Sequence, residues 1–189
     1  MAYVGMRYFA AAVIDTEHDN APPTYKPGKI IGQARRADIS WTKDDAELPA
    51  DDMIVEAENT TVGGNIAIEM ADLNDEAQIM LFGYEAGTDG EIVEHVGKSP
   101  NVGFGYIRTK KSGKAEGEWL YKVVFSPGNE NAATKDRTTS FQTPTADGKI
   151  MLVYTDANGN IAPKVHKNFD TVGEALTWLK AKAGIQGAG

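Results

Sequence analysis

The amino-acid sequence predicts an α+β fold, dominated by antiparallel β-sheet and carrying two helices, in a single domain of residues 1–189. Three observations support this class. Apolar residues in most segments recur at every second position, which is typical of strands with one buried face. Two segments change to helical spacing, and each begins with a capping signal. The length suits one domain, since domains commonly contain ~100–200 residues.

The N-terminal quarter is expected to form two strands around a loop. Apolar residues predict a first strand over residues 7–14. Residues 15–28 hold three of the eight prolines, which have no N–H to donate to a sheet, so this segment is predicted as a loop. A second strand is predicted over residues 29–41 and a polar loop over residues 42–51.

A hairpin is predicted around Gly63-Gly64, a pair that is typical of turns. Residues 52–59 precede the glycines and residues 65–70 follow them, and both segments alternate in polarity. The alternation predicts one buried face, with Ile66, Ile68 and Met70 on it and Glu69 on the opposite face.

Two helices are predicted. The first covers residues 72–82, with Asp72 or Asn74 able to cap its free N–H groups and Gly83 placed to end it. The second covers residues 171–183, where Thr171 and Glu174 form a capping box.

The second half of the chain predicts further strands. Val102 to Arg108 alternates large side chains with glycines, which permit close approach of a neighbouring backbone or side chain. Residues 118–125 place Trp119, Tyr121, Val123 and Phe125 at a spacing of two, which predicts that all four share one face. The remaining expectations are a charged turn at 110–114, a long loop at 126–136, strands at 138–143 and 149–155, and a turn at 156–159.

The composition of the chain disfavours several classes of function. The formal net charge of -8 disfavours tight binding to the phosphate backbone of nucleic acids. The chain has no cysteine, which excludes disulfides, thiolate metal sites and cysteine nucleophiles. We find no signal peptide and no apolar stretch near the ~20 residues that span a bilayer, so a soluble protein is expected.

No motif for catalysis or cofactor binding emerges. His18, His95 and His166 are scattered rather than spaced as metal ligands. The segment from Asp156 resembles the start of a calcium loop, but Lys167 stands where that loop needs a bidentate Glu, so a hairpin turn is the better interpretation. The serines lack a nucleophile-elbow context. The sequence therefore predicts no enzyme, no cofactor and no metal.

Several segments, taken in order, resemble the major tail protein family of long-tailed bacteriophages. They are the leader Ala2-Tyr3-Val4-Gly5, the segment LPADDMIVE at 48–56, the acidic segment ending at Leu73 before a helix, the strand PNVGFGYI at 100–107, and the strand 119–125 before Ser126-Pro127. The similarity extends to about residue 144, and residues 169–179 also match.

This resemblance implies a tail tube subunit with two packed antiparallel β-sheets, in a sandwich-like or barrel-like arrangement, and a flanking helix. Six copies would form a ring, and rings would stack into a tube around a tape-measure protein, between a tail terminator and baseplate or initiator proteins. The tube would conduct double-stranded DNA without binding it specifically, and the protein would be located in the virion tail. Lumen-facing acidic candidates are Glu56, Glu58 and Glu69, and candidates for a loop between subunits are Pro22, Pro23, Tyr25 and Pro27.

Two other functions stay open. One is a ring protein of a type VI secretion tube, which shares this tube fold. The other is a monomeric β-rich carbohydrate-binding module, which needs an exposed aromatic platform. Trp41, Trp119 and Trp178 are the tryptophan candidates for that platform, and the periodicity favours burial of Trp119.

Overall fold

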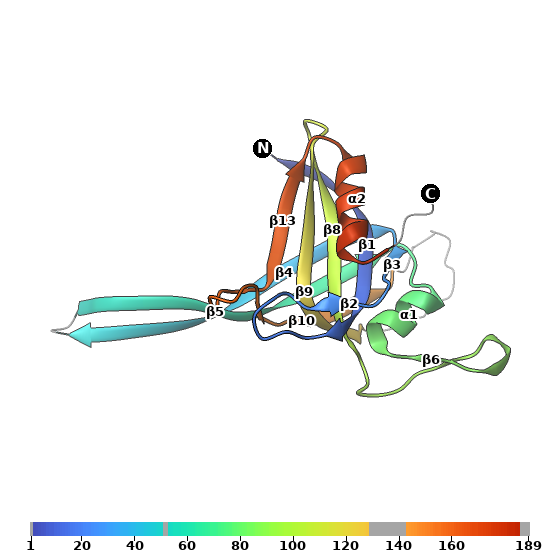
Figure 1. Ribbon diagram of the computed structural model, residues 1–189, viewed down its shortest axis with the longest axis horizontal. Helices are drawn as coiled ribbons and strands as arrows, with labels where there is room; N and C mark the ends of the chain where they lie inside the picture. The colour runs from blue at the N-terminus through green and yellow to red at the C-terminus, as the bar shows by residue number, and fades with distance from the viewer. Residues whose placement is uncertain (1, 51–52, 129–142, 186–189) are drawn as a thin grey trace, which may run out of the picture.

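The computed structural model describes residues 2–50, 53–128 and 143–185, and of residues 45–50 and 53–59 it describes the backbone alone. One antiparallel sheet dominates the fold (Figure 1). Its strands are β1 (Tyr3–Thr16), β2 (Thr24–Tyr25), β3 (Lys29–Gly32), β4 (Ala34–Ala50), β5 (Met53–Met70), β8 (Asn101–Lys110), β9 (Ala115–Pro127), β10 (Thr145–Ile150) and β13 (Lys164–Phe169). The predicted class, α+β with mainly antiparallel strands, is confirmed.

The sheet curls so that its two ends meet. Its strand order is β2-β1-β8-β9-β10-β5-β4, with β3 also paired to β1 and β13 to β9. Gln33 alone separates β3 from β4, so one segment joins both ends of the sheet. Two packed sheets were expected, but β10 pairs with both β9 and β5 and thereby links the two halves into one sheet. The barrel-like arrangement therefore arises by rolling.

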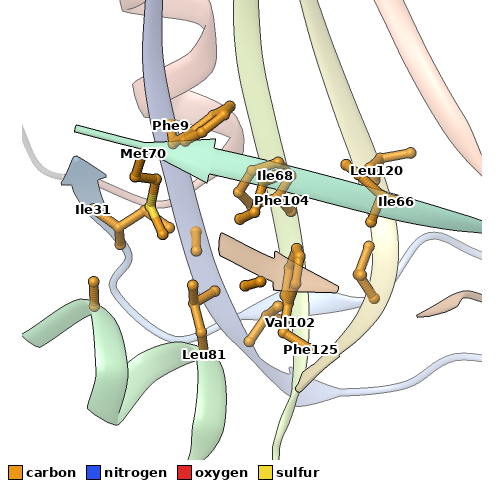
Figure 2. Packing of buried hydrophobic residues seen from close by; sticks show 14 of the residues in the cluster. Phe9, Ile31, Ile66, Ile68, Met70, Leu81, Val102, Phe104, Leu120 and Phe125 are labelled. Carbon is orange, nitrogen blue, oxygen red and sulfur yellow. The ribbon is translucent and has the colours of Figure 1, made fainter. Parts of the chain in front are cut away.

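The core fills the inside of this roll. Figure 2 shows Ile66, Ile68 and Met70 of β5 facing Phe9 of β1 and Phe104 of β8, and all five side chains are almost fully buried. Helix α1 (Asp75–Phe82) closes one end of the roll through Leu81. The predicted buried face of β5 is thus confirmed.

A second cluster lies on the other side of the sheet, beneath helix α2 (Val172–Lys182). Trp119 is fully buried there and packs with Leu179. The glycines of β8 make this packing possible, because a Cβ on Gly103 would lie 2.4 Å from Cζ2 of Trp119 and one on Gly105 would lie 2.6 Å from Cδ1 of Leu179. The expected close approach at these glycines is confirmed.

Both helices have the side-chain caps that the sequence predicts, although α1 begins at Asp75 rather than at residue 72 and the Glu174 carboxylate accepts from the Asp170 N–H. The Asn74 side chain accepts a hydrogen bond from the Ala77 N–H, and the Thr171 side chain accepts one from the Glu174 N–H. Gly83 ends α1 in the left-handed conformation. Shorter elements complete the described fold: β6 (Glu85–Ala86), a 3₁₀ turn (Thr88–Gly90), β7 (Ile92–Val93), β11 (Val153–Tyr154) and β12 (Ile161–Ala162). The predicted turn at 156–159 joins β11 to β12.

The predicted hairpin around Gly63-Gly64 is wrong. Strand β4 continues to Ala50 through the predicted loop 42–51, and β5 runs unbroken through both glycines. Thr42 pairs with Gly63 and Lys43 with Thr61, so Val62 is the extra residue of a β-bulge. The glycines serve the bulge and close packing, since a Cβ on Gly64 would lie 2.8 Å from the Ser40 carbonyl oxygen.

Other boundaries also differ. The predicted strand 29–41 is broken at Gln33, because β3 and β4 have different partners. A register shift near residue 121 moves Val123 and Phe125 to the inner core, whereas Trp119 and Tyr121 face α2, so the four do not share a face. Strand β13 was not predicted, and the strand expected at 149–155 is divided between β10 and β11. Residues 129–142, with the strand predicted at 138–143 and most of the loop predicted at 126–136, lie outside the described residues.

Candidate assembly surface

The feature that stands out from the body is a two-stranded arm, defined here as residues 43–62 (Figure 1). Its strands pair from Lys43 with Thr61 to Ala50 with Met53. Strand β10 pairs with β5 only over residues 64–69, so within the described residues each strand of the arm has the other as its single neighbour. A two-stranded ribbon without a packed face is only marginally stable alone, so a further partner for the arm is expected.

The arm concentrates the charge of the chain. Residues 43–62 contain seven acidic residues and one basic residue, a net charge of -6 within a total of -8. Where its side chains are described, they are largely in solvent: Lys43, Asp44 and Thr60 are exposed, and Val62 is 51% exposed. The arm is therefore acidic and leaves its backbone edges open.

Of the three acidic candidates for the lumen, Glu69 lies in the body of the sheet, whereas Glu56 and Glu58 lie in the arm. Glu69 lies on the exposed face of β5, opposite the core, as predicted. It is not a free carboxylate, because Arg35 Nη1 lies 3.5 Å from its Oε1 and the Thr143 hydroxyl donates to it at 2.5 Å. Glu56 and Glu58 belong to the β5 ladder in the arm, and their side chains lie outside those described.

The open face around Glu69 is polar but carries both signs of charge. Strands β4, β5 and β10 present on it Arg36, Asp38, Ser40, Asn65, Asp147 and Lys149. Arg36 Nε and Asp38 Oδ2 form an ion pair at 2.5 Å. In the described part of the sheet, this face is therefore less acidic than a lumen rich in Asp and Glu.

The loop candidates are partly tied to their own chain. The Tyr25 hydroxyl donates to the Tyr121 carbonyl at 2.8 Å and accepts from Trp119 Nε1 at 3.2 Å. Burial raises the pKa of Tyr25 above its ordinary value. Pro23 is buried, whereas Pro22 is half-buried and Pro27 is exposed. Most of residues 15–28 is loop, as predicted, but β2 inside it contributes to the core on the α2 side.

A buried charged network occupies the inner face of β8, β9 and β13, and no sequence motif indicated it. Glu118 is 1% exposed and Glu116 is 5% exposed. Glu118 accepts from the Tyr106 hydroxyl at 2.7 Å, from Lys164 Nζ at 3.1 Å and from Arg108. The Glu118 carboxylate is therefore paired, as a buried charge must be, whereas Arg108 Nε is buried without a hydrogen-bond partner among the described residues. The sequence signal that could have revealed this network is the β8–β9 hairpin, in which Arg108 pairs with Glu116 and lies beside Glu118.

Tyr3 of β1 extends this network. Its hydroxyl donates to Glu116 Oε2 at 2.7 Å, and the Arg108 guanidinium lies 4.3 Å from its ring centroid. Burial by itself would raise the pKa of Glu116. The hydrogen bond from Tyr3 and the Arg108 charge outweigh it and hold this pKa below its ordinary value of 4.5.

Stability should fall at both ends of the pH range. The lowered pKa of Glu116 means that its contribution is present above pH 4.5 and is lost as the pH falls through its folded-state pKa. Burial, then the charge of Glu118, raise the pKa of Tyr106 above 10.0, so its contribution is present below pH 10.0 and is lost at higher pH. Urea midpoints between pH 3 and pH 11 measure this. In a Tyr106→Phe variant the alkaline fall should be less steep, and an unchanged fall would contradict the assignment.

A groove of about 980 Å³ adjoins the base of the arm. It lies between the sheet and the segment after β7, with Ile39, Phe125, His95 and Val96 among its lining residues. Among the residues with described side chains, no three His, Asp or Glu side chains converge as metal ligands would.

The tryptophan candidates for a carbohydrate platform are mostly covered. Trp119 is fully buried, and the ring of Trp178 lies 5.8 Å from that of Phe169. Trp41 is half-buried, with Lys164 Nζ 5.8 Å from its ring centroid.

A scan of protein families finds none that matches this chain, and a search of curated proteins finds no relative. In the part of the chain that the structure describes, no helix has the length and apolar character needed to cross a bilayer.

Proposed function

We propose that this protein is a non-enzymatic structural subunit, the repeating unit of the tail tube of a long-tailed bacteriophage. Hexameric rings of the protein stack into a tube through which the genome is delivered. The observation that carries the proposal is the arm, a two-stranded acidic ribbon that leaves the body and has open edges among the described residues. Open strand edges are templates for pairing with another chain.

Two further observations support an assembling subunit. Two segments that carry the family resemblance lie in the sheet and in the arm: residues 101–107 form most of β8, an interior strand of the sheet, and residues 48–50 end β4 at the far end of the arm. The exposed face around Glu69 is an extended polar surface of mixed charge. Such a surface lacks the excess of positive charge that would hold the phosphates of passing DNA, although it is less acidic than the lumen that the sequence predicts.

In this proposal the main partner is the protein itself. The tape-measure protein, the tail terminator and the baseplate or initiator proteins are the others, and the location is the virion tail. The type VI ring protein shares the assembling-subunit interpretation and is distinguished by association with a contractile sheath.

Negative-stain electron microscopy of the purified protein across a concentration series, paired with light scattering, tests this function. We expect rings or hollow tubes above a threshold concentration, because each copy brings both an arm and open sheet edges. A protein that stays monomeric at every concentration, with its arm intact by mass spectrometry, would contradict the proposal. Binding in a glycan screen by that monomer would favour the carbohydrate-binding alternative.

A further inference from the structure

Strand β1 consists of two halves that are held differently. Residues 9–12 are completely buried between the two cores. Residues 3–7 are exposed apart from Met6, with Tyr3 44% and Val4 62% exposed. In the described structure, β3 pairs with β1 only at residues 9–11 and β2 only at residues 14–16, so residues 3–7 have β8 as their single neighbour. This half is a strand edge with a small buried area.

A strained residue separates the halves. Tyr8 has a φ of 56°, in the left-handed region that bulky side chains rarely adopt. The register with β8 shifts at the same place, since Arg7 pairs with Ile107 and Ala10 with Gly105. The irregularity at Tyr8 therefore divides the contacts of residues 3–7, of which Met6 packs against the inner core, from those of residues 9–12.

The outer half of β1, residues 3–7, binds through Tyr3 to a site formed by Arg108, Lys110 and Glu116, which is called the seat. The Tyr3 hydroxyl donates to the buried carboxylate of Glu116, and its ring lies beneath Arg108 with Lys110 Nζ at 5.4 Å from its centroid. If Tyr3 left the seat, the buried Glu116 carboxylate would lose the hydrogen bond from the Tyr3 hydroxyl. Losing a donor to a buried charged group is unfavourable. A vacated seat is thus expected to be refilled by the same chemical group.

From these features we propose that residues 3–7 exchange between copies, so that Tyr3 of one copy occupies the seat formed by Arg108, Glu116 and Lys110 of another copy. The exchanged segment makes the same ladder bonds and the same hydrogen bond to Glu116, so no contact is lost. The exposed Tyr3 and Val4 then lie between two copies rather than on one. This inference rests on the proposed self-assembly and adds to it a contact distinct from the arm.

Single-cysteine variants test the exchange, because the chain has no cysteine of its own. Gly5 pairs with Thr109, and a Cβ on Gly5 would lie 2.9 Å from the Thr109 hydroxyl oxygen. Gly5→Cys and Thr109→Cys are prepared separately, with different mass tags, mixed, assembled and oxidised. A disulfide between the two variants that forms far more efficiently than in a control pair indicates that residues 3–7 of one chain lie on β8 of another. We expect this mixed disulfide in about half of the assembled chains of an equal mixture, because random mixing places half of the Gly5→Cys segments on Thr109→Cys subunits.

The matched control is the pair Ser126→Cys and Asp147→Cys. These residues are exposed register partners on β9 and β10, neither of which has a free half like that of β1, so no mixed disulfide is expected. If Gly5→Cys does not fold, Ala2→Cys with Lys111→Cys probes the same contact, since the Lys111 N–H donates to the Ala2 carbonyl at 3.3 Å.

The outcomes separate this inference from the proposed function. Rings or tubes without a mixed disulfide, with folded variants, overturn the exchange and leave the tube proposal standing. A mixed disulfide in small oligomers that never form rings supports the exchange and counts against the tube. If neither rings or tubes nor a mixed disulfide are found, the exchange and the tube proposal are both overturned.

Discussion

Replacing residues 43–62 by Asn-Gly is expected to give a folded protein that forms neither rings nor tubes. The two new residues suit a tight hairpin turn, and they would join Thr42 to Gly63, which are register partners at the base of the arm. The core should be preserved, because the exposed side chains described in the arm add little to it and Ile66, Ile68 and Met70 stay in place. Surface changes of this kind typically alter the free energy of unfolding by less than ~0.5 kcal/mol per residue.

Urea unfolding and electron microscopy measure the two halves of this expectation. A matched variant keeps the length of the arm and replaces its seven acidic residues by Asn and Gln. Assembly by this arm without acidic residues would show that backbone pairing holds the subunits together, whereas loss of assembly would assign the contact to charge. If the shortened protein formed tubes, the arm would not be needed for assembly, and the main support for the proposed function would be lost.

The second large effect is expected at Glu118. Replacing it by Ala removes an acceptor for Tyr106, Arg108 and Lys164, which leaves Lys164 without its carboxylate and Arg108 with Glu116 alone. Removing one partner of a buried ion pair costs about 3–5 kcal/mol, a large part of the ~5–15 kcal/mol that stabilises a typical domain. The variant should therefore unfold at a much lower urea concentration. Glu118→Gln, which keeps the shape and one acceptor oxygen, should have a smaller effect.

Glu76→Ala is the control for this comparison. Glu76 forms an ion pair with Lys29 at 2.8 Å, but its side chain is 65% exposed. Exposed pairs contribute about 0–1 kcal/mol, so this variant should unfold close to the wild type. Fluorescence of the buried Trp119 reports the transition in each variant. Equal urea midpoints for Glu118→Ala and Glu76→Ala would show that the buried network does not stabilise the fold.

The contacts of Tyr25 determine which variants can test an assembly role of the loop 15–28. Tyr25 packs on Trp119 with ring centroids 5.3 Å apart, and its hydroxyl bonds to the backbone of β9. A deletion that removes Tyr25 would therefore affect folding as well as assembly. Substitutions at the exposed Pro27 alone separate the two effects.

Local chemistry determined much of this fold from the sequence alone. Asn74 and Thr171 mark the helix starts, because a side-chain acceptor satisfies N–H groups that no earlier turn can reach. The alternation at Ile66, Ile68 and Met70 marks a buried strand face, and the glycines of β8 mark the place where Trp119 and Leu179 approach. These features depend on residues within a few positions of each other, or on space that only glycine leaves.

The arm, the rolled sheet and the buried charges depend on tertiary contacts, and the sequence did not predict them. Polar residues at 42–50 and two glycines resemble loop and turn when read locally, but pairing between β4 and β5 over their whole length makes them strands. Glu116 and Glu118 resemble ordinary surface charges until β8, β13 and Tyr3 bring their partners to them. Hydrogen-bond partners far apart in the chain determine these features, and spacing along the sequence carries no record of which distant strand will lie alongside.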